Sequence, residues 1–88
     1  MAVKVIDFWA PWCPPCKIMN PIIEELEKEL KGKVEFVKYN VDEEQEMSQK
    51  YGVMSIPTYV IEKDGNEVAR TTGARSKEDF KSWIEEQL

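Results

Sequence analysis

Apolar residues fill one short segment near the start of the chain and then recur at helical spacing. Residues 3–9 are apolar apart from Lys4 and Asp7, a pattern that predicts a strand buried on both faces of a sheet. From Cys13 onward, apolar residues recur about every fourth position, which predicts a long amphipathic helix. Gly32 is expected to end this helix, and Pro21 is expected to kink it. The apolar face of that helix comprises Ile18, Met19, Ile22, Ile23, Leu26 and Leu30.

A second strand and a short helix are predicted next. Residues 34–41 are rich in Val, Phe and Tyr, which favours a strand. Because a helix connects it to the first strand, the two strands are expected to run parallel in one sheet. Asp42 and Gln45 resemble a capping box that opens a short helix through Tyr51, with Gly52 as its terminator.

The last part of the chain predicts a hairpin and a final helix. Strand patterns at 58–61 and 67–72 flank Asp64-Gly65, a pair typical of a hairpin turn. Ser76 and Asp79 are expected to cap the last helix. Its apolar stripe comprises Phe80, Trp83, Ile84 and Leu88. The predicted order is βαβαββα.

Size and charge narrow the classes of function. With 88 residues, the chain is expected to form a single domain, 1–88. Its formal net charge of -5 argues against nucleic acid or an anionic membrane surface as the main partner. The apolar runs are too short to cross a bilayer, and the first residues lead into a strand without a signal peptide. We therefore expect a cytoplasmic protein.

The only two cysteines, Cys13 and Cys16, stand at the predicted start of the long helix. A sulfur at the helix start lies over the free N–H groups and the positive end of the helix dipole, which favours the thiolate. Pro14 suits the first helical position, where no backbone N–H is needed. Cys13 should be the exposed, acidic thiol and Cys16 the sheltered one. The spacing indicates a redox pair.

Two other uses of the cysteine pair fit less well. A zinc or iron–sulfur site takes about four ligands. The chain has two cysteines and no histidine, so a metal site would need a second copy or carboxylate ligands. A purely structural disulfide across so short a loop would remove little entropy from the unfolded chain. We therefore expect neither a bound metal nor a bound cofactor.

The segment VIDFWAPWCPPCK at residues 5–17 resembles the active-site strand and loop of the thioredoxin family. Further matches to that family are Pro21, residues 38–42, Ile56-Pro57-Thr58 and Gly73-Ala74. Pro14 stands where the family usually has Gly, and the strand and helix that precede the active-site strand in full-length members have no counterpart here. The resemblance implies a thioredoxin-like three-layer α/β sandwich. Its four-stranded mixed sheet has helices on both faces, with the second strand at one edge, followed by the first, third and fourth.

Asp7 is an ionisable residue inside the predicted buried strand. From the pattern alone it is either a strand-end carboxylate that reaches solvent or a buried group, and burial is costly unless the group is partnered or neutral. The resemblance implies that Asp7 lies beneath Cys16, with a pKa raised by desolvation, and carries a proton to and from that thiol. Lys38 matches the family's partner lysine and is expected to moderate the rise.

The resemblance also implies a substrate-binding groove beside the cysteines. A cis Ile56–Pro57 bond would bring both residues against the pair and leave the Ile56 backbone free to hydrogen bond with an extended substrate. Trp12 is expected to supply apolar contact surface next to the reactive sulfur. Pro14 and Gly73 complete the expected groove.

The predicted function is thiol-disulfide oxidation and reduction, with the chain acting as a protein-disulfide reductase and electron carrier. Its expected partners are disulfide-containing proteins and a thioredoxin reductase as electron donor, and the chain is expected to be a monomer. Three alternatives stay open: a glutaredoxin-like activity, a disulfide oxidase or isomerase, and a non-catalytic protein-binding module.

Overall fold

The strands and helices follow the predicted order along the chain. The computed structural model describes residues 2–88, with elements β1 (Val3–Trp9), α1 (Pro14–Glu29), β2 (Glu35–Asn40), α2 (Gln45–Lys50), β3 (Thr58–Lys63), β4 (Asn66–Thr72) and α3 (Lys77–Glu85). No helix within residues 2–88 has the length and apolar character needed to span a membrane.

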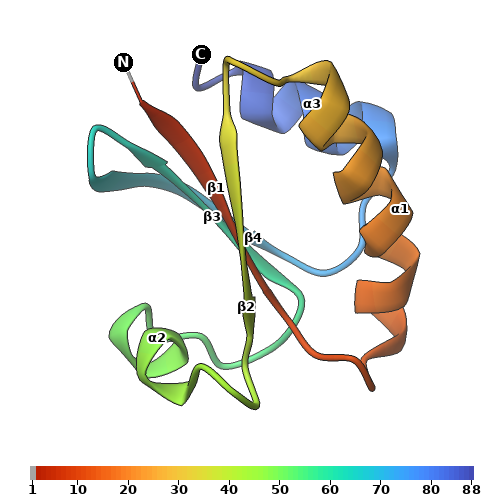
Figure 1. Cartoon of the computed structure of the whole chain (residues 1–88), viewed down its shortest axis with the longest axis vertical. Helices are drawn as coiled ribbons and strands as arrows, with labels where there is room; N and C mark the ends of the chain where they lie inside the picture. The colour runs from red at the N-terminus through yellow and green to blue at the C-terminus, as the bar shows by residue number, and fades with distance from the viewer. Residues whose placement is uncertain (1) are drawn as a thin grey trace.

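The four strands form one mixed sheet in the order β2-β1-β3-β4, which confirms the predicted topology. β1 pairs parallel with β2 and antiparallel with β3, and β3 and β4 form the antiparallel hairpin. Figure 1 shows α1 and α3 together on one face of the sheet and α2 on the other. This arrangement places the C-terminal end of β1, and the loop that follows it, at the start of α1.

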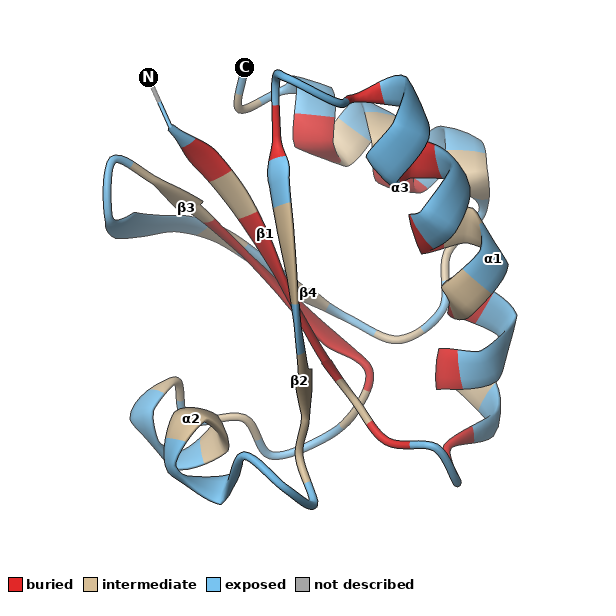
Figure 2. Cartoon of the chain, viewed as in Figure 1, coloured by how far each residue is buried: buried red, intermediate tan, exposed pale blue. Residues whose placement is uncertain are grey.

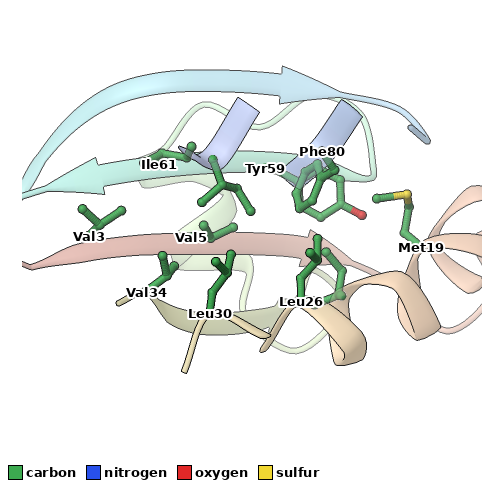
Figure 3. Close-up of a cluster of buried hydrophobic side chains, with 11 residues drawn as sticks. Val3, Val5, Met19, Leu26, Leu30, Val34, Tyr59, Ile61 and Phe80 are labelled. Carbon is green, nitrogen blue, oxygen red and sulfur yellow. The ribbon is translucent and has the colours of Figure 1, made fainter. Parts of the chain in front are cut away.

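β1 is buried on both faces, as its apolar run predicts. Val3 and Val5 belong to the larger core cluster, which packs between the sheet and helices α1 and α3 (Figure 3). Ile6 and Phe8 belong to a second cluster on the α2 side. Figure 2 shows buried residues along β1 and β3 in the middle of the sheet. Alternation along the strand therefore puts Asp7 on the face that α1 covers.

Helix α1 begins where the sequence predicts and ends slightly earlier. Pro14 is its first residue, and Pro21 lies inside it. The helix stops at Glu29 with Leu30 as its C-cap, and the Leu30 carbonyl accepts from the N–H groups of Lys33 and Val34. Gly32, expected as the terminator, lies in the turn beyond, at a φ of 86°.

Two predictions about the other helices were wrong. Asp42 does not cap α2: Glu44 is the N-cap residue, and it makes no side-chain cap hydrogen bond. Leu88 does not join the apolar stripe of α3, because it lies beyond the end of the helix and is 45% exposed. Ser76 caps α3 as predicted, accepting from the Asp79 N–H at 3.1 Å.

Candidate active site

The cysteine pair forms a disulfide at the start of α1. Cys13 is the N-cap residue of the helix, in extended conformation, and its Sγ accepts from the Cys16 N–H at 3.3 Å. Pro14 and Pro15 donate no backbone hydrogen bond, so Cys16 carries the first N–H that can reach the cap sulfur. The Cys13 sulfur thus lies at the N-terminus of α1, where the positive end of the helix dipole is located.

Both cysteines are buried in the disulfide form, which corrects the expectation of an exposed Cys13. Cys13 is 3% exposed and Cys16 1%. The reason is packing: Trp9, Val41 and Ile56 lie against the cluster that the cysteines form with Ala10. Sequence spacing shows the helix start, but not the later segments that fold over it.

Asp7 is 2% exposed, and its Oδ1 has no hydrogen-bond partner among the described residues. Alternate residues of β1 share one face of the sheet, so Asp7 lies on the same face as Val5 and Trp9. Val5 belongs to the larger core cluster, and Trp9 packs against the cysteines. The carboxyl group therefore lies on the α1 side of the sheet, near the strand end that leads to the redox loop.

Burial controls the electrostatics of Asp7. Desolvation raises the pKa of its carboxyl group to about 6, the nearby charge of Lys38 opposes the rise, and the charge of Glu27 adds to it. Lys38 is the register partner of Asp7 on β2, and its Nζ lies 5.3 Å from the centre of the Trp9 ring. A carboxyl group with this pKa can take up and release a proton near neutral pH.

Trp12 projects into solvent from the loop before α1, with 62% of its surface exposed. Its indole Nε1 donates a 2.8 Å hydrogen bond to Asp42 Oδ2, in the connection between β2 and α2. The spacing of Asp42 and Gln45 predicts a helix cap instead of this contact with Trp12. No local pattern could reveal it, because 30 residues separate the two partners.

We predict that Asp42→Ala weakens substrate binding without changing the chemistry. Losing the acceptor frees the Trp12 ring, and a hydrogen bond of this kind contributes about 1 kcal/mol, so KM for a protein disulfide should rise about fivefold at nearly constant kcat. Steady-state kinetics of insulin reduction would measure both constants. Glu43→Ala, which removes an exposed neighbouring carboxylate, is the matched control. A fall in kcat at unchanged KM would contradict this role.

The loop before β3 brings one of the predicted groove residues, Ile56, against the cysteine cluster. The Ile56–Pro57 peptide bond is cis. Thr58 Oγ1 anchors the loop by donating to the Ser55 carbonyl at 2.6 Å. Gly73, at a φ of 89°, donates its N–H to the Pro57 carbonyl at 2.9 Å. The segment after β4 is thereby held against the same loop.

A shallow hollow of about 390 Å³ lies beside this loop. It is lined by Trp12, Val41, Ser48, Val53, Met54, Ser55 and Ile56. The hollow joins Trp12 to Ile56, whereas Pro14, Pro57 and Gly73 are not among its lining residues. Met54 is 97% exposed at its edge. Together with Trp12 it leaves an apolar surface next to the cysteine pair, of the kind that contacts other proteins.

No group of three or more His, Cys, Asp or Glu side chains within residues 2–88 is arranged to hold a metal ion. The chemistry available to the described site is that of two thiols, a buried carboxyl group and a nearby lysine.

Comparison with known proteins matches nearly the whole chain. The family model described as thioredoxin matches residues 2–86. Thioredoxin from Bacillus subtilis (strain 168) is 48% identical over 86 residues, covering 98% of this chain and 83% of the relative. Thioredoxin from Rickettsia felis is 43% identical over 84 residues, covering 96% and 80%. The X-ray structure of Fasciola hepatica thioredoxin superposes with a TM-score of 0.92 at 40% identity, covering 99% of this chain and 82% of that one.

Proposed function

The chain belongs to the thioredoxin family, and from this membership we propose how its cysteine pair performs disulfide reduction. As a family member with the Cys13–Cys16 pair, it is a thiol-disulfide oxidoreductase that reduces protein disulfides. The assignment of roles to individual residues rests on one observation, the capping of α1 by the Cys13 sulfur.

In the first step, the Cys13 thiolate attacks one sulfur of a substrate disulfide. A Cys13–substrate mixed disulfide forms, the substrate disulfide breaks, and the other substrate sulfur leaves as a thiolate. Cys13 is suited to this role because the helix N-terminus stabilises negative charge on its sulfur. Cys16, one turn into the helix, lacks that position.

In the second step, Cys16 attacks the Cys13 sulfur of the mixed disulfide. The intramolecular disulfide forms, and the second substrate sulfur is released as a thiolate that takes up a proton. Asp7 accepts the proton that Cys16 loses, since its raised pKa lets the carboxyl group exchange protons near neutral pH. The charge of Lys38 keeps the pKa of Asp7 from rising further. A separate reductase then reduces the Cys13–Cys16 disulfide back to the dithiol.

Substrate binding is assigned to the surface around the pair: Trp12, Pro14, Ile56, Pro57 and Gly73. The Ile56 backbone takes part in none of the loop or cap hydrogen bonds of residues 2–88, so it is available to pair with an extended substrate segment. The apolar hollow between Trp12 and Ile56 would take a side chain next to the substrate cysteine.

The partners proposed for this cycle are disulfide-containing proteins and a thioredoxin reductase, in the cytoplasm, where thiols are kept reduced. We propose that residues 1–88 act as one domain and as a monomer. β2 is an outer strand of the sheet. Exposed Glu35 and Lys38 discourage edge pairing with a second copy. Light scattering would test the monomer directly.

Substrate preference separates this function from a glutaredoxin-like activity. We expect fast reduction of insulin disulfides and slow reduction of glutathione mixed disulfides, because the groove offers apolar surface and a free backbone rather than a built glutathione site. Parallel assays of wild type and the Cys13→Ser, Cys16→Ser double variant would decide. Preference for the glutathione substrate would support a glutaredoxin-like activity. A wild type as inactive as the double variant toward both substrates would support a non-catalytic binding module.

A further inference from the structure

A buried tyrosine stands directly across from Asp7 in the sheet. Tyr59 on β3 is the antiparallel register partner of Asp7, as Lys38 is its parallel partner on β2. Directly opposed side chains on neighbouring antiparallel strands project from the same face, with Cβ atoms about 5 Å apart. Tyr59 therefore shares the layer between the sheet and α1 with the proposed proton carrier, and it is 1% exposed.

The position of the ring directs its hydroxyl group toward the active-site half of the core. The Tyr59 ring packs edge-on against Phe80, with centroids 4.7 Å apart. Figure 3 shows the hydroxyl pointing toward Met19, which lies one turn after Cys16 on α1. Packing alone would be served equally by phenylalanine, since a buried hydroxyl costs free energy unless it has a polar partner.

The polar group that matches this hydroxyl is the Asp7 carboxyl, whose Oδ1 is buried without a hydrogen-bond partner in the described structure. The other charged groups that act on Asp7 are Lys38 on β2 and Glu27 on α1. Burial and the Asp7 charge both raise the pKa of the Tyr59 phenol, which keeps it a neutral donor throughout the physiological range.

We propose that Tyr59 is a positioning residue for proton transfer, whose hydroxyl stabilises the charged Asp7 carboxylate through one bridging water, since Asp7 Oδ1 has no direct hydrogen-bond partner among the described residues. The proposal rests on the role of Asp7 in the proposed function. The bridge favours the charged form, so Asp7 is still a base when Cys16 must give up its proton. When the proton moves from the Cys16 sulfur to Asp7, the carboxyl group becomes neutral and the bridge weakens.

The test is the titration of Asp7 in wild type and in Tyr59→Phe, which keeps the ring and removes the hydroxyl. We expect the Asp7 pKa, followed by carboxyl ¹³C NMR of the disulfide form, to rise by about one unit, the effect of losing one hydrogen bond to a charged group. The pH midpoint of insulin reduction should move up by the same amount. Tyr39→Phe, which removes a hydroxyl on the α2 side of the sheet beside Phe8, should shift neither.

Asp7→Asn separates the failure of this inference from the failure of the proposed function. With Asp7→Asn present, Tyr59→Phe should leave the pH profile unchanged. An Asp7 pKa in Tyr59→Phe equal to that of wild type would overturn the role of Tyr59, whatever Asp7 does. A shifted pKa together with an Asp7→Asn variant as active as wild type would uphold the Tyr59–Asp7 contact and remove Asp7 from the mechanism.

Discussion

Cys16→Ser should turn the protein from a catalyst into a trap for its substrates. Without the second thiol, the mixed disulfide between Cys13 and a substrate has no internal nucleophile to resolve it. A neighbouring thiol attacks with an effective concentration of order 10⁵ M or more, which thiols in solution cannot match. Turnover of insulin should therefore fall at least about a hundredfold, while covalent adducts accumulate.

Non-reducing electrophoresis and intact mass spectrometry would detect these adducts. Cys13→Ser is the matched control: it should lose activity equally and form no adducts, because only the Cys13 sulfur caps α1, whereas Cys16 lies inside the helix without that stabilisation of its thiolate. In the reduced protein, alkylation at neutral pH should favour Cys13. Equal trapping by both variants, or faster alkylation of Cys16, would reverse the assigned roles.

Asp7→Asn should slow the enzyme and stabilise the fold. The carboxyl group that takes the Cys16 proton is lost, so turnover near pH 7 should fall about tenfold to a hundredfold, at or below the low end of the range for general acid–base catalysis. The free energy of unfolding should rise, because burial makes the charged form of Asp7 unfavourable and the substitution replaces it by a neutral side chain.

The gain in stability should depend on pH in a specific direction. The pKa of Asp7 is raised from 3.8 to about 6. Well below pH 4 the carboxyl group is therefore neutral in both the folded and the unfolded protein, and its burial carries no charge penalty. As the pH rises from 4 to 6, the unfolded state loses the proton first and the folded state is penalised. Above pH 6 the full penalty applies, on the order of 3 kcal/mol.

Urea unfolding of the disulfide form at pH 4 and pH 8 would measure this difference. The stability advantage of Asp7→Asn over wild type should be small at pH 4 and largest at pH 8. At pH 8 we expect about 1–3 kcal/mol, which is less than the full penalty of the charged carboxylate because burying the asparagine amide also costs free energy. Glu24→Gln, on an exposed part of α1, is a control that should show no such trend. Lower stability in Asp7→Asn at pH 8 together with normal turnover would make Asp7 a structural partner.

The parts of the fold that depend on local pattern could be predicted from the sequence. β1 has the predicted bounds because its continuous apolar run fits a central strand, and the helical crossover fixes its parallel pairing with β2. The start of α1 was equally visible, since Cys13 and Pro14 fit the cap and first helical positions. The order of the strands in the sheet was implied by the resemblance to the thioredoxin family, because local pattern does not determine on which side of β1 the hairpin pairs.

Local sequence pattern could not predict contacts between distant segments, and the contact of Ile56 with the cysteine pair was expected only from the family resemblance. Asp42 has the spacing of a helix cap, yet its carboxylate accepts from Trp12, a partner that the fold brings close. The burial of Cys13 depends on Val41, just after β2, and Ile56, in the loop before β3. Tyr59 looks like any core aromatic until the strand register places it opposite Asp7. Each of these features is tertiary.

The midpoint potential of the Cys13–Cys16 couple tests most directly whether the protein is poised as a reductase. Replacing the family's usual Gly by Pro14 removes no donor from the Cys13 sulfur, because the cap bond comes from the Cys16 N–H. No histidine separates the cysteines, and Lys17 is the cation next to them in sequence. Strongly oxidising members of this fold owe their potential to extra stabilisation of the reduced form.

Equilibration against glutathione buffers of known ratio would give that potential. We predict a midpoint near the reference value for thioredoxin, about -270 mV, and far from the value of about -120 mV for a periplasmic disulfide oxidase. A midpoint more oxidising than roughly -200 mV would contradict the reductase assignment and favour an oxidase or isomerase.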